Sequence, residues 1–552
     1  MLDNKYFPFA KVRPEQQEIF DAINKDLKKR YIIIEAATGI GKSPIAIEAA
    51  LSDGKGYIVT DSIQLQNQYE SDFSKQLVSM KGKGNYTCTR RPSLTCDVCP
   101  LVKNHKELGK CIKTCAYHIK KQEAEASPIF LTNYAFYLTS SFHNPNFKPR
   151  NVVVFDEAHL LEKHLTESFT IEINVNTYDK KYDLFANALP SELNLLQKPI
   201  SSYNGDYGKF IQAIKVCLDR ELKKLIQSAD SNSKLLDDPN LTEEEKDSLD
   251  FILSGNKVIA ELQSLIFGLD SFLMPHNDGN WLTDITTSYN YDTNQNEETL
   301  QLKPLKVDWA FHAAEDFATD HVYFLSATIL DHKLFCASLG IDENDVLFVQ
   351  KESPFDPDNS PIYEVCTCKT SYAALQDNAN LDKIADYVKM ILDIHKNEKG
   401  IIHSGNKRIS VYLKNKLNDT RLLVNDNVLN NREIYDMHLK SKDATVLVSS
   451  SMSEGVDLKD DLSRFQIVVK MPFDSLADIR VKTLAKMNQK WYQCEMMKKF
   501  VQQCGRSTRS ENDHCTTYVL DESFVGYLKS AQKNHWLTEQ FVKRCRPVSA
   551  SN

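Results

Sequence analysis

The sequence lacks any apolar run long enough to cross a membrane, and it has no excess of basic charge. No stretch approaches the roughly 20 consecutive apolar residues that a membrane-spanning helix needs. The 552 residues carry a formal net charge of −8, so a surface that binds a polyanion has to be local. The opening MLDNKYFPF lacks the basic segment and apolar run of a secretory signal. We therefore expect a cytoplasmic protein, or a nucleoid or nuclear one, with no membrane partner.

The chain also lacks short-period repeats and low-complexity linkers, and it is too long for one ordinary core. Its length predicts about three or four domains. In a reducing compartment its 13 cysteines are not expected to form disulfides, so metal binding or burial is favoured. Five of them fall between Cys88 and Cys115, a density that scattered buried thiols do not explain.

Short β-branched runs alternate with segments of helical periodicity. YIIIEA at 31–36 is followed by a loop and a helical pattern, and GYIVT ends the next strand at Thr60. NVVVFDEAH at 151–159 is apolar on both faces, as a strand of a parallel sheet should be, and HVYFLSAT at 321–328 resembles it. This alternation predicts a doubly wound α/β domain. After about residue 350 the pattern resumes, which predicts a second α/β domain of similar size.

Two segments interrupt the first α/β pattern and look like insertions. Residues 81–127 are rich in cysteine and lysine, and residues 166–310 are mostly helical in periodicity, with a capping box at Thr242 and Glu245. The predicted division is 1–80, 128–165 and 311–350 for the first α/β domain, 81–127 for the cysteine-rich insertion, 166–310 for the helical insertion and 351–552 for the second α/β domain.

AATGIGKS has the residue types of a phosphate-binding loop. Its backbone N–H groups can wrap phosphate oxygens, and the following helix points its positive dipole end at them. Lys42 would reach the β- and γ-phosphates of ATP, and Ser43 would ligate Mg²⁺. An alanine stands where the usual pattern has its first glycine. The residues expected to contact the nucleotide here are Ala36, Ala37, Thr38, Gly39, Ile40, Gly41, Lys42 and Ser43.

Two further motifs supply the acids and cations of phosphoryl transfer. In DEAH, Asp156 would hold Mg²⁺, and Glu157 would position and deprotonate the attacking water. In QQCGRSTR, which begins at Gln502, Arg506 and Arg509 stand three residues apart and would project from one helix face toward the γ-phosphoryl group. A solvated basic helix end is the alternative for this motif alone. The order of the motifs along one chain argues against it.

In this order the motifs resemble those of superfamily 2 DNA helicases, and within them the XPD/DinG-like (Rad3-related, DEAH-box) iron–sulfur family. The resemblance covers nearly the whole chain and implies two RecA-like motor domains, with an iron–sulfur domain and a helical arch domain inserted into the first. It also implies that Gln16 lies near the adenine and Asp457 near the nucleotide. The segments that carry it are RPEQ (13–16), EAATGIGKS, TDSIQLQNQ, DEAH, Ser326–Thr328, LTNYAF (131–136), ESPF (352–355), SEGVDL and the motif at 502–509.

The clustered cysteines are candidates for a metal site. Zinc would suit four thiolates, and the spacing of Cys96 and Cys99 is zinc-like. The resemblance favours a [4Fe–4S] cluster, which four thiolates also hold, and spacing alone does not separate the two metals. We predict Cys88, Cys99 and Cys115 as ligands, with Cys111 as the fourth and Cys96 as the alternative to Cys111.

The same segment is locally basic. Between Lys81 and Lys121 there are ten lysines and arginines against two acids. Such a patch would bind phosphates in a salt-dependent, sequence-independent way. A solvated positive face is the alternative.

The sequence therefore predicts an ATP-dependent DNA helicase that uses ATP, Mg²⁺ and a [4Fe–4S] cluster. The resemblance implies 5′ to 3′ movement on single-stranded DNA and unwinding of duplex in repair or replication. Expected partners are single-stranded and forked DNA, bound by a monomeric motor, with loading proteins as further candidates. The alternative is a DNA-stimulated ATPase that remodels nucleoprotein, or serves as a repair-complex scaffold, without separating strands.

Overall fold

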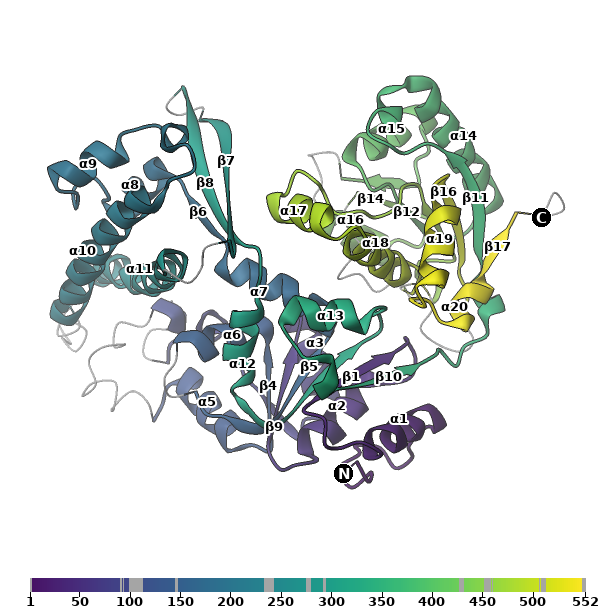
Figure 1. Cartoon of the computed structure of the whole chain (residues 1–552), viewed down its shortest axis with the longest axis horizontal. Helices are drawn as coiled ribbons and strands as arrows, with labels where there is room; N and C mark the ends of the chain where they lie inside the picture. Colours follow the sequence, from purple (N-terminus) through teal and green to yellow (C-terminus); the bar gives the residue numbers. More distant parts are fainter. Residues whose placement is uncertain are drawn as a thin grey trace.

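The computed structural model contains two α/β units and a third, mainly helical unit (Figure 1). In this view the first α/β unit lies at the bottom, the helical unit at the upper left and the second α/β unit at the upper right. The described residues are 2–89, 92, 94–98, 113–143, 147–232, 243–274, 279–290, 294–425, 431–450, 458, 460–505, 507 and 513–548.

The first α/β domain is built on a sheet of seven parallel strands. These are β1 (Tyr31–Ala36), β2 (Gly56–Thr60), β3 (Leu77–Ser79), β4 (Ile129–Asn133), β5 (Arg150–Asp156), β9 (Ala318–Ser326) and β10 (Val346–Lys351). Their order across the sheet is β10-β1-β9-β5-β2-β4-β3. Along β1, Ile32 and Ile34 enter one core and Ile33 enters the other. Both faces are therefore buried, which explains the continuous apolar runs.

Helices cover both faces of this sheet. They are α1 (Pro14–Asn24), α2 (Lys42–Leu51), α3 (Ile63–Asp72), α5 (Ala116–Ala126), α6 (Tyr134–His143), α7 (Leu161–Phe169), α12 (Asp308–Glu315) and α13 (His332–Leu339). α1 and α2 pack into the core that holds Ile32, whereas α6 and α12 pack into the core that holds Ile33. The doubly wound α/β domain is confirmed.

The second α/β domain repeats this plan. Its strands are β11 (Ile362–Cys368), β12 (Gly400–His403), β13 (Leu422–Val424), β14 (Val446–Ser449), β15 (Phe465–Val468), β16 (Thr516–Asp521) and β17 (Cys545–Pro547), all parallel in the order β13-β14-β12-β15-β16-β11-β17. Its helices are α14 (Asn378–Ile394), α15 (Lys407–Leu417), α16 (Asn431–Lys440), α17 (Ile479–Met487), α18 (Gln489–Cys504), α19 (Phe524–Lys533) and α20 (Glu539–Arg544). The predicted second domain is confirmed, while the predicted boundary residues stay predictions.

The helical insertion has its own core and also contains a sheet. Its helices are α8 (Val175–Tyr182), α9 (Pro190–Leu196), α10 (Gly208–Asn232) and α11 (Glu243–Leu273), and its antiparallel strands are β6 (Ile171–Ile173), β7 (Trp281–Asn290) and β8 (Gln295–Pro304). Leu300 and Leu302 of β8 are fully buried against the helices. The sequence pattern predicted helices here, which are present, but not the hairpin of β7 and β8. Alternating Thr, Ile and Tyr in WLTDITTSYN was the available signal for it.

The two α/β domains share buried contacts. Leu330, which follows β9 in the first domain, lies in the same core as Met497 and Trp536 of the second. The Trp536 indole N–H donates to Asp331 Oδ2 at 3.0 Å. Since a buried indole needs such a partner, this bond fixes the second domain against the first.

The second domain also contacts the helical insertion and α7. Arg480 at the start of α17 pairs with Glu162 of α7 at 2.5 Å and donates to the Pro304 carbonyl at 3.1 Å. Lys303 of β8 pairs with Asp478, the N-cap of α17.

Among the described residues, no helix combines the length and the apolarity needed to cross a membrane.

Arg150, at the start of β5, holds the end of α5 to the first sheet. Its guanidinium is 7% exposed and lies over the rings of Tyr57 and Phe130, 5.1 and 5.5 Å from their centroids. It donates to the backbone carbonyls of Gly56, Ala124, Glu125, Ser127 and Pro128.

Replacing Arg150 by methionine should destabilise the first domain, because it leaves several buried carbonyls without a donor. The loss should reach about 3 kcal/mol, since each buried unsatisfied group costs about 1–3 kcal/mol. Thermal unfolding followed by circular dichroism measures it. Arg432→Met is the matched control, because the Arg432 side chain is 77% exposed and should leave the midpoint unchanged. Equal midpoints for the two variants would contradict the assigned role.

Candidate active site

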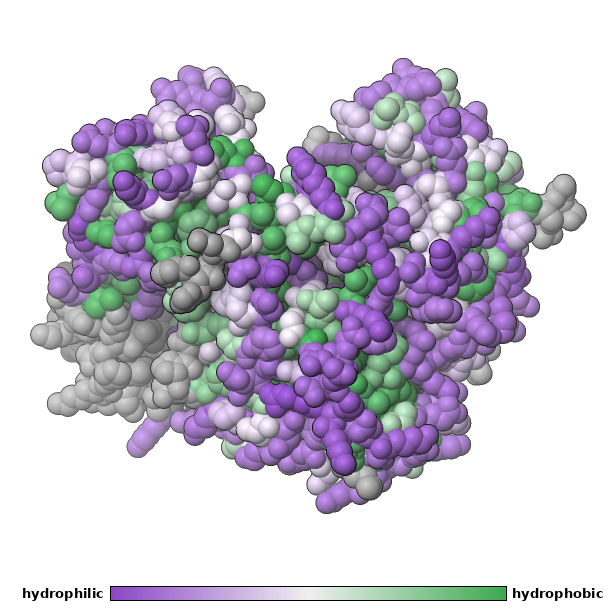
Figure 2. Space-filling view, viewed as in Figure 1, coloured by the Kyte–Doolittle hydropathy of each residue, from purple (hydrophilic) through white to green (hydrophobic). Residues whose placement is uncertain are grey.

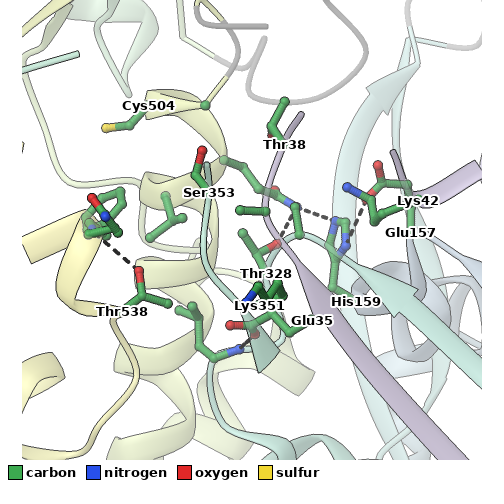
Figure 3. Close-up of a pocket in the computed structure, with 18 of the residues that line it drawn as sticks. Glu35, Thr38, Lys42, Glu157, His159, Thr328, Lys351, Ser353, Cys504 and Thr538 are labelled. Carbon is green, nitrogen blue, oxygen red and sulfur yellow. Dashed lines mark hydrogen bonds and ion pairs between the residues drawn. The ribbon is translucent and has the colours of Figure 1, made fainter. Parts of the chain in front are cut away.

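A cavity of about 540 Å³ lies between the two α/β domains (Figure 3). The first domain lines it with the loop after β1, the start of α3, the turn after β5 and the turn after β9. The segment 351–360, the end of α18 and the segment 536–544 complete the lining. The cavity therefore brings together most of the motifs that the sequence singled out.

The loop after β1 has the backbone of a phosphate-binding loop. Gly39 and Gly41 adopt φ of 94° and 89°, a region that residues with a Cβ rarely adopt. The Gln16 side-chain amide donates to the carbonyls of Ile40 and Gly41 at 3.0 and 3.2 Å. Those carbonyls are thus turned toward α1, and Gln16 lies at the loop. Its expected position near the adenine stays a prediction.

Two residues from the second half of the chain approach this loop. A Cβ added at Gly39 would lie 2.1 Å from the ring of Phe355, and one added at Gly505 would lie 3.6 Å from Thr38 Oγ1. A side chain at Gly39 would therefore overlap the Phe355 ring, whereas a Cβ at Gly505 would be in ordinary van der Waals contact with Thr38. The segment ESPF and the end of α18 both close over the loop.

Asp156 ends β5 as a buried carboxylate. Its Oδ1 accepts the Glu157 N–H at 3.0 Å, and its Oδ2 accepts the Tyr69 hydroxyl at 2.7 Å. Burial and the charge of Glu157 raise the pKa of Asp156 to about 6, and Lys42 opposes the shift. Ser43 lies in the first turn of α2, directly after the phosphate-binding loop. Ser43 and Asp156 therefore offer the hard oxygen ligands that Mg²⁺ prefers, so the two residues fit the ion.

Glu157 is held in an unusual backbone conformation. It has φ of 52° and ψ of 44° and precedes the short 3₁₀ turn Ala158–Leu160. Left-handed conformations of non-glycine residues carry strain and persist where the surroundings impose them. Both Glu157 and Lys42 line the cavity (Figure 3). The carboxylate therefore lies where it can contact a nucleotide.

A hydrogen-bonded chain crosses from the first domain to the second. The Gln502 side-chain amide at the end of α18 donates to Thr328 Oγ1 at 2.9 Å and also to His159 Nε2. His159 Nδ1 then carries the proton and bonds Ser326 Oγ at 2.9 Å. The sequence predicted Gln502 as a site residue, and the structure brings it to the DEAH and SAT motifs.

Glu35 is a site residue that sequence reasoning missed. Its buried carboxylate accepts the N–H groups of Ile329 and Leu330 and, at 2.7 Å, the Gln350 amide. Leu330 has φ of 61°, so the carboxylate supports a strained turn directly after SAT. Burial raises the pKa of Glu35. A single acid inside the apolar strand YIIIEA was the signal that could have identified it.

Three of the five clustered cysteines are described, and they lie together. Cys96 and Cys115 are buried in the same core. Burial, together with the neighbouring Cys115 and Cys88, raises the pKa of Cys96 to about 12. Within the described ranges, no group of three or more His, Cys, Asp or Glu side chains has the arrangement of a metal site. Cys99 and Cys111 lie outside those ranges.

A small antiparallel turn brings these cysteines together. Cys88 N–H donates to the Leu94 carbonyl and Cys96 N–H to the Tyr86 carbonyl, each at 2.8 Å. Thr89 Oγ1 donates to the Thr114 carbonyl at 2.7 Å, which ties this turn to the segment before Cys115. Cys96, the sequence analysis's alternative ligand, thus faces two of the three that it preferred.

Several predicted residues fall outside the described part of the chain. They include Asp457, Arg506 and Arg509, so their roles stay predictions. Half of the basic patch also lies there. Of its described cations, Lys81, Lys120 and Lys121 pair with Glu70, Glu123 and Glu125, which supports the solvated-face alternative for these three.

Comparisons with known proteins agree with the two-domain architecture. Residues 9–190 match the family "Type III restriction enzyme, res subunit", and residues 402–540 match "Helicase C-terminal domain". A probable ATP-dependent helicase of Methanocaldococcus jannaschii is 21% identical, with 95% of this chain and 93% of that protein aligned.

Solved structures show the same fold. An XPD helicase structure superposes with a TM-score of 0.63 at 16% identity, covering 98% of this chain and 100% of the other. Xpd4 of S. tokodaii gives a TM-score of 0.54 at 15% identity, covering 97% and 100%. Both α/β domains are RecA-like. The resemblance to XPD helicases that the motifs indicated is confirmed as a likeness of fold.

Two substitutions should separate ATP binding from ATP hydrolysis. Lys42→Ala should weaken ATP binding and remove most hydrolysis, because it deletes the positive charge expected at the phosphates. Glu157→Gln keeps the shape and should bind ATP normally but stop turnover. Fluorescent-nucleotide binding and phosphate release measure the two steps. Lys389→Ala is the control, because this side chain of α14 is 61% exposed, and it should change neither binding nor hydrolysis. Hydrolysis at the parental rate by Glu157→Gln would show that Glu157 takes no part in the reaction.

Proposed function

We propose that this chain is an ATP-dependent DNA helicase that moves 5′ to 3′ along single-stranded DNA in repair or replication. The cavity carries the proposal, because it places Lys42 and Glu157 of one RecA-like domain opposite Gln502 of the other. The names of the relatives support helicase activity. The DNA substrate and the direction rest on the family resemblance of the motifs.

The residues of the cavity suit phosphoryl transfer from ATP to water. The phosphates lie at the N-terminus of α2, where backbone N–H groups and Lys42 neutralise their charge. Glu157 accepts the proton of the attacking water. Ser43 and Asp156 would hold Mg²⁺, which supplies neutralisation of the β- and γ-phosphate oxygens when bound.

Contacts across the cavity couple this chemistry to movement. Gln502 bonds His159 and Thr328 of the first domain, so the position of the second domain depends on the DEAH and SAT motifs. Arg506 follows Gly505, which lines the cavity, and we assign Arg506 and Arg509 to the γ-phosphoryl group. Closing and opening of the cleft move one strand along a monomeric motor, and the helical insertion serves as an arch over it.

The proposed helicase should hydrolyse ATP faster with single-stranded DNA and separate forked duplexes that carry a 5′ tail. Binding should weaken steeply with salt, because phosphate contacts release counterions. Fluorescence-based unwinding of 5′- and 3′-tailed forks measures the activity, with Glu157→Gln as the inactive control. DNA-stimulated hydrolysis without strand separation would instead support the remodelling of nucleoprotein.

A [4Fe–4S] cluster held by Cys88, Cys96, Cys99 and Cys115 is part of the proposal. The grouping of Cys88, Cys96 and Cys115 fits a thiolate-ligated group in donor type. The fourth ligand has to come from outside the described residues. Cys96 lies near Cys88 and Cys115, whereas Cys111 lies outside the described residues. We therefore propose Cys96 in the place that the sequence analysis gave to Cys111. When bound, the cluster would cross-link the segment covalently.

Purified without air, the protein should be brown, with about four irons per chain and absorbance near about 400 nm. Cys96→Ser should lose the iron, whereas Cys111→Ser should keep it. Both should retain ATPase, because both cysteines belong to the inserted segment 81–127 and not to the motifs that line the cavity. Cys217→Ser, at a buried thiol of α10, is the matched control and should keep its iron. A colourless zinc protein, or iron retained by Cys96→Ser and lost by Cys111→Ser, would contradict this assignment.

A further inference from the structure

Tyr69 of α3 reaches the expected Mg²⁺ ligand Asp156 from within the core. The residue is 1% exposed. Its hydroxyl donates to Asp156 Oδ2 at 2.7 Å. This bond joins α3 to the end of β5.

The ring and the hydroxyl of Tyr69 have separate roles. The ring packs in the core beneath the first sheet, with its centroid 5.8 Å from that of Phe73. A phenylalanine would fill this space equally well. A buried hydroxyl costs free energy unless it is bonded, and here its partner is a carboxylate, which gives a charge-assisted bond. Packing therefore explains the ring but not the hydroxyl.

The hydroxyl fixes the orientation of the Asp156 carboxylate. Oδ1 already accepts the Glu157 N–H, and a single bond would leave the group free to rotate about χ2. The bond from Tyr69 to Oδ2 removes that rotation. Each oxygen keeps lone-pair capacity for a cation or its water, because a carboxylate oxygen accepts more than one bond.

We propose that Tyr69 is a positioning residue for the metal-dependent step of nucleotide binding, acting through Asp156. The inference rests on the proposed function, since it assumes that Mg²⁺·ATP occupies the cavity. Tyr69 is not among the residues that line the cavity. It holds the Asp156 carboxylate in one orientation, so the ion meets a ligand that is already arranged.

Tyr134 offers a matched control. Its side chain is fully buried, and its hydroxyl donates to the Asp156 backbone carbonyl at 3.1 Å. Tyr134→Phe and Tyr69→Phe therefore remove the same group from the same neighbourhood. Only the second removes a bond to the carboxylate.

The test measures binding of a fluorescent, non-hydrolysable ATP analogue with saturating Mg²⁺ and with chelator. The ratio of the two affinities is the gain due to the metal. We expect Tyr69→Phe to lower this gain about tenfold, the scale of one hydrogen bond to a charged group, and to leave the metal-free affinity unchanged. Tyr134→Phe should preserve the gain within about twofold. Thermal unfolding verifies that both variants fold.

The outcomes are distinct. An unchanged gain in Tyr69→Phe overturns the inference, and so does an equal loss in Tyr134→Phe, because any buried hydroxyl would then have the same effect. A parent protein that binds no nucleotide under either condition overturns the proposed function itself. Loss of the gain in Tyr69→Phe alone establishes Tyr69 as the positioning residue.

Discussion

The carboxyl ends of three neighbouring parallel strands meet at one edge of the first sheet, and the site depends on that constraint. β1 leads into the phosphate-binding loop, β5 ends at Asp156 and β9 ends at Ser326. The register aligns Ile34 with Leu325 and Leu325 with Asp156. Parallel strands place their carboxyl ends together by geometry alone. Motifs more than a hundred residues apart in sequence therefore meet without further contacts to guide them.

The second RecA-like domain completes a site that the first cannot form alone. Leu330 enters the core of the second domain beside Trp536, and Glu35 supports the turn that carries it. The Glu35 carboxylate, on the strand before the phosphate-binding loop, accepts hydrogen bonds from the SAT turn and from Gln350 of β10. The segment 351–360, which follows β10, places Phe355 over Gly39. A shift of the second domain therefore changes the packing around the loop, because packed groups do not deform continuously.

The sequence predicted the site residues that stand together in short motifs. It missed the residues that meet their partners only when distant segments fold together. The phosphate-binding loop, DEAH and Gln502 stand in short motifs whose residue types follow from their chemistry. Tyr69 looks like any core aromatic in QLQNQYESDF, because its partner lies in another strand. The sequence left Cys96 and Cys111 as alternatives for the fourth ligand, because spacing does not reveal which thiols a turn brings together. The β7–β8 hairpin was missed because long helical periodicities flank it and dominated the interpretation.

The electrostatics of Asp156 explain why so many polar groups converge on it. Burial and the adjacent Glu157 both disfavour its charge, and its pKa rises to about 6. Lys42, the Tyr69 hydroxyl and the Glu157 N–H act in the opposite sense. None of these three is a full counter-charge in contact with the carboxylate, so its pKa stays above the usual range. A divalent cation at Ser43 and Asp156 would favour the charged form, because a bound ion outweighs the partial charges around it. The fold therefore holds a carboxylate that lacks a counter-charge until a cation binds, and such a group binds the cation most strongly when its orientation is fixed beforehand.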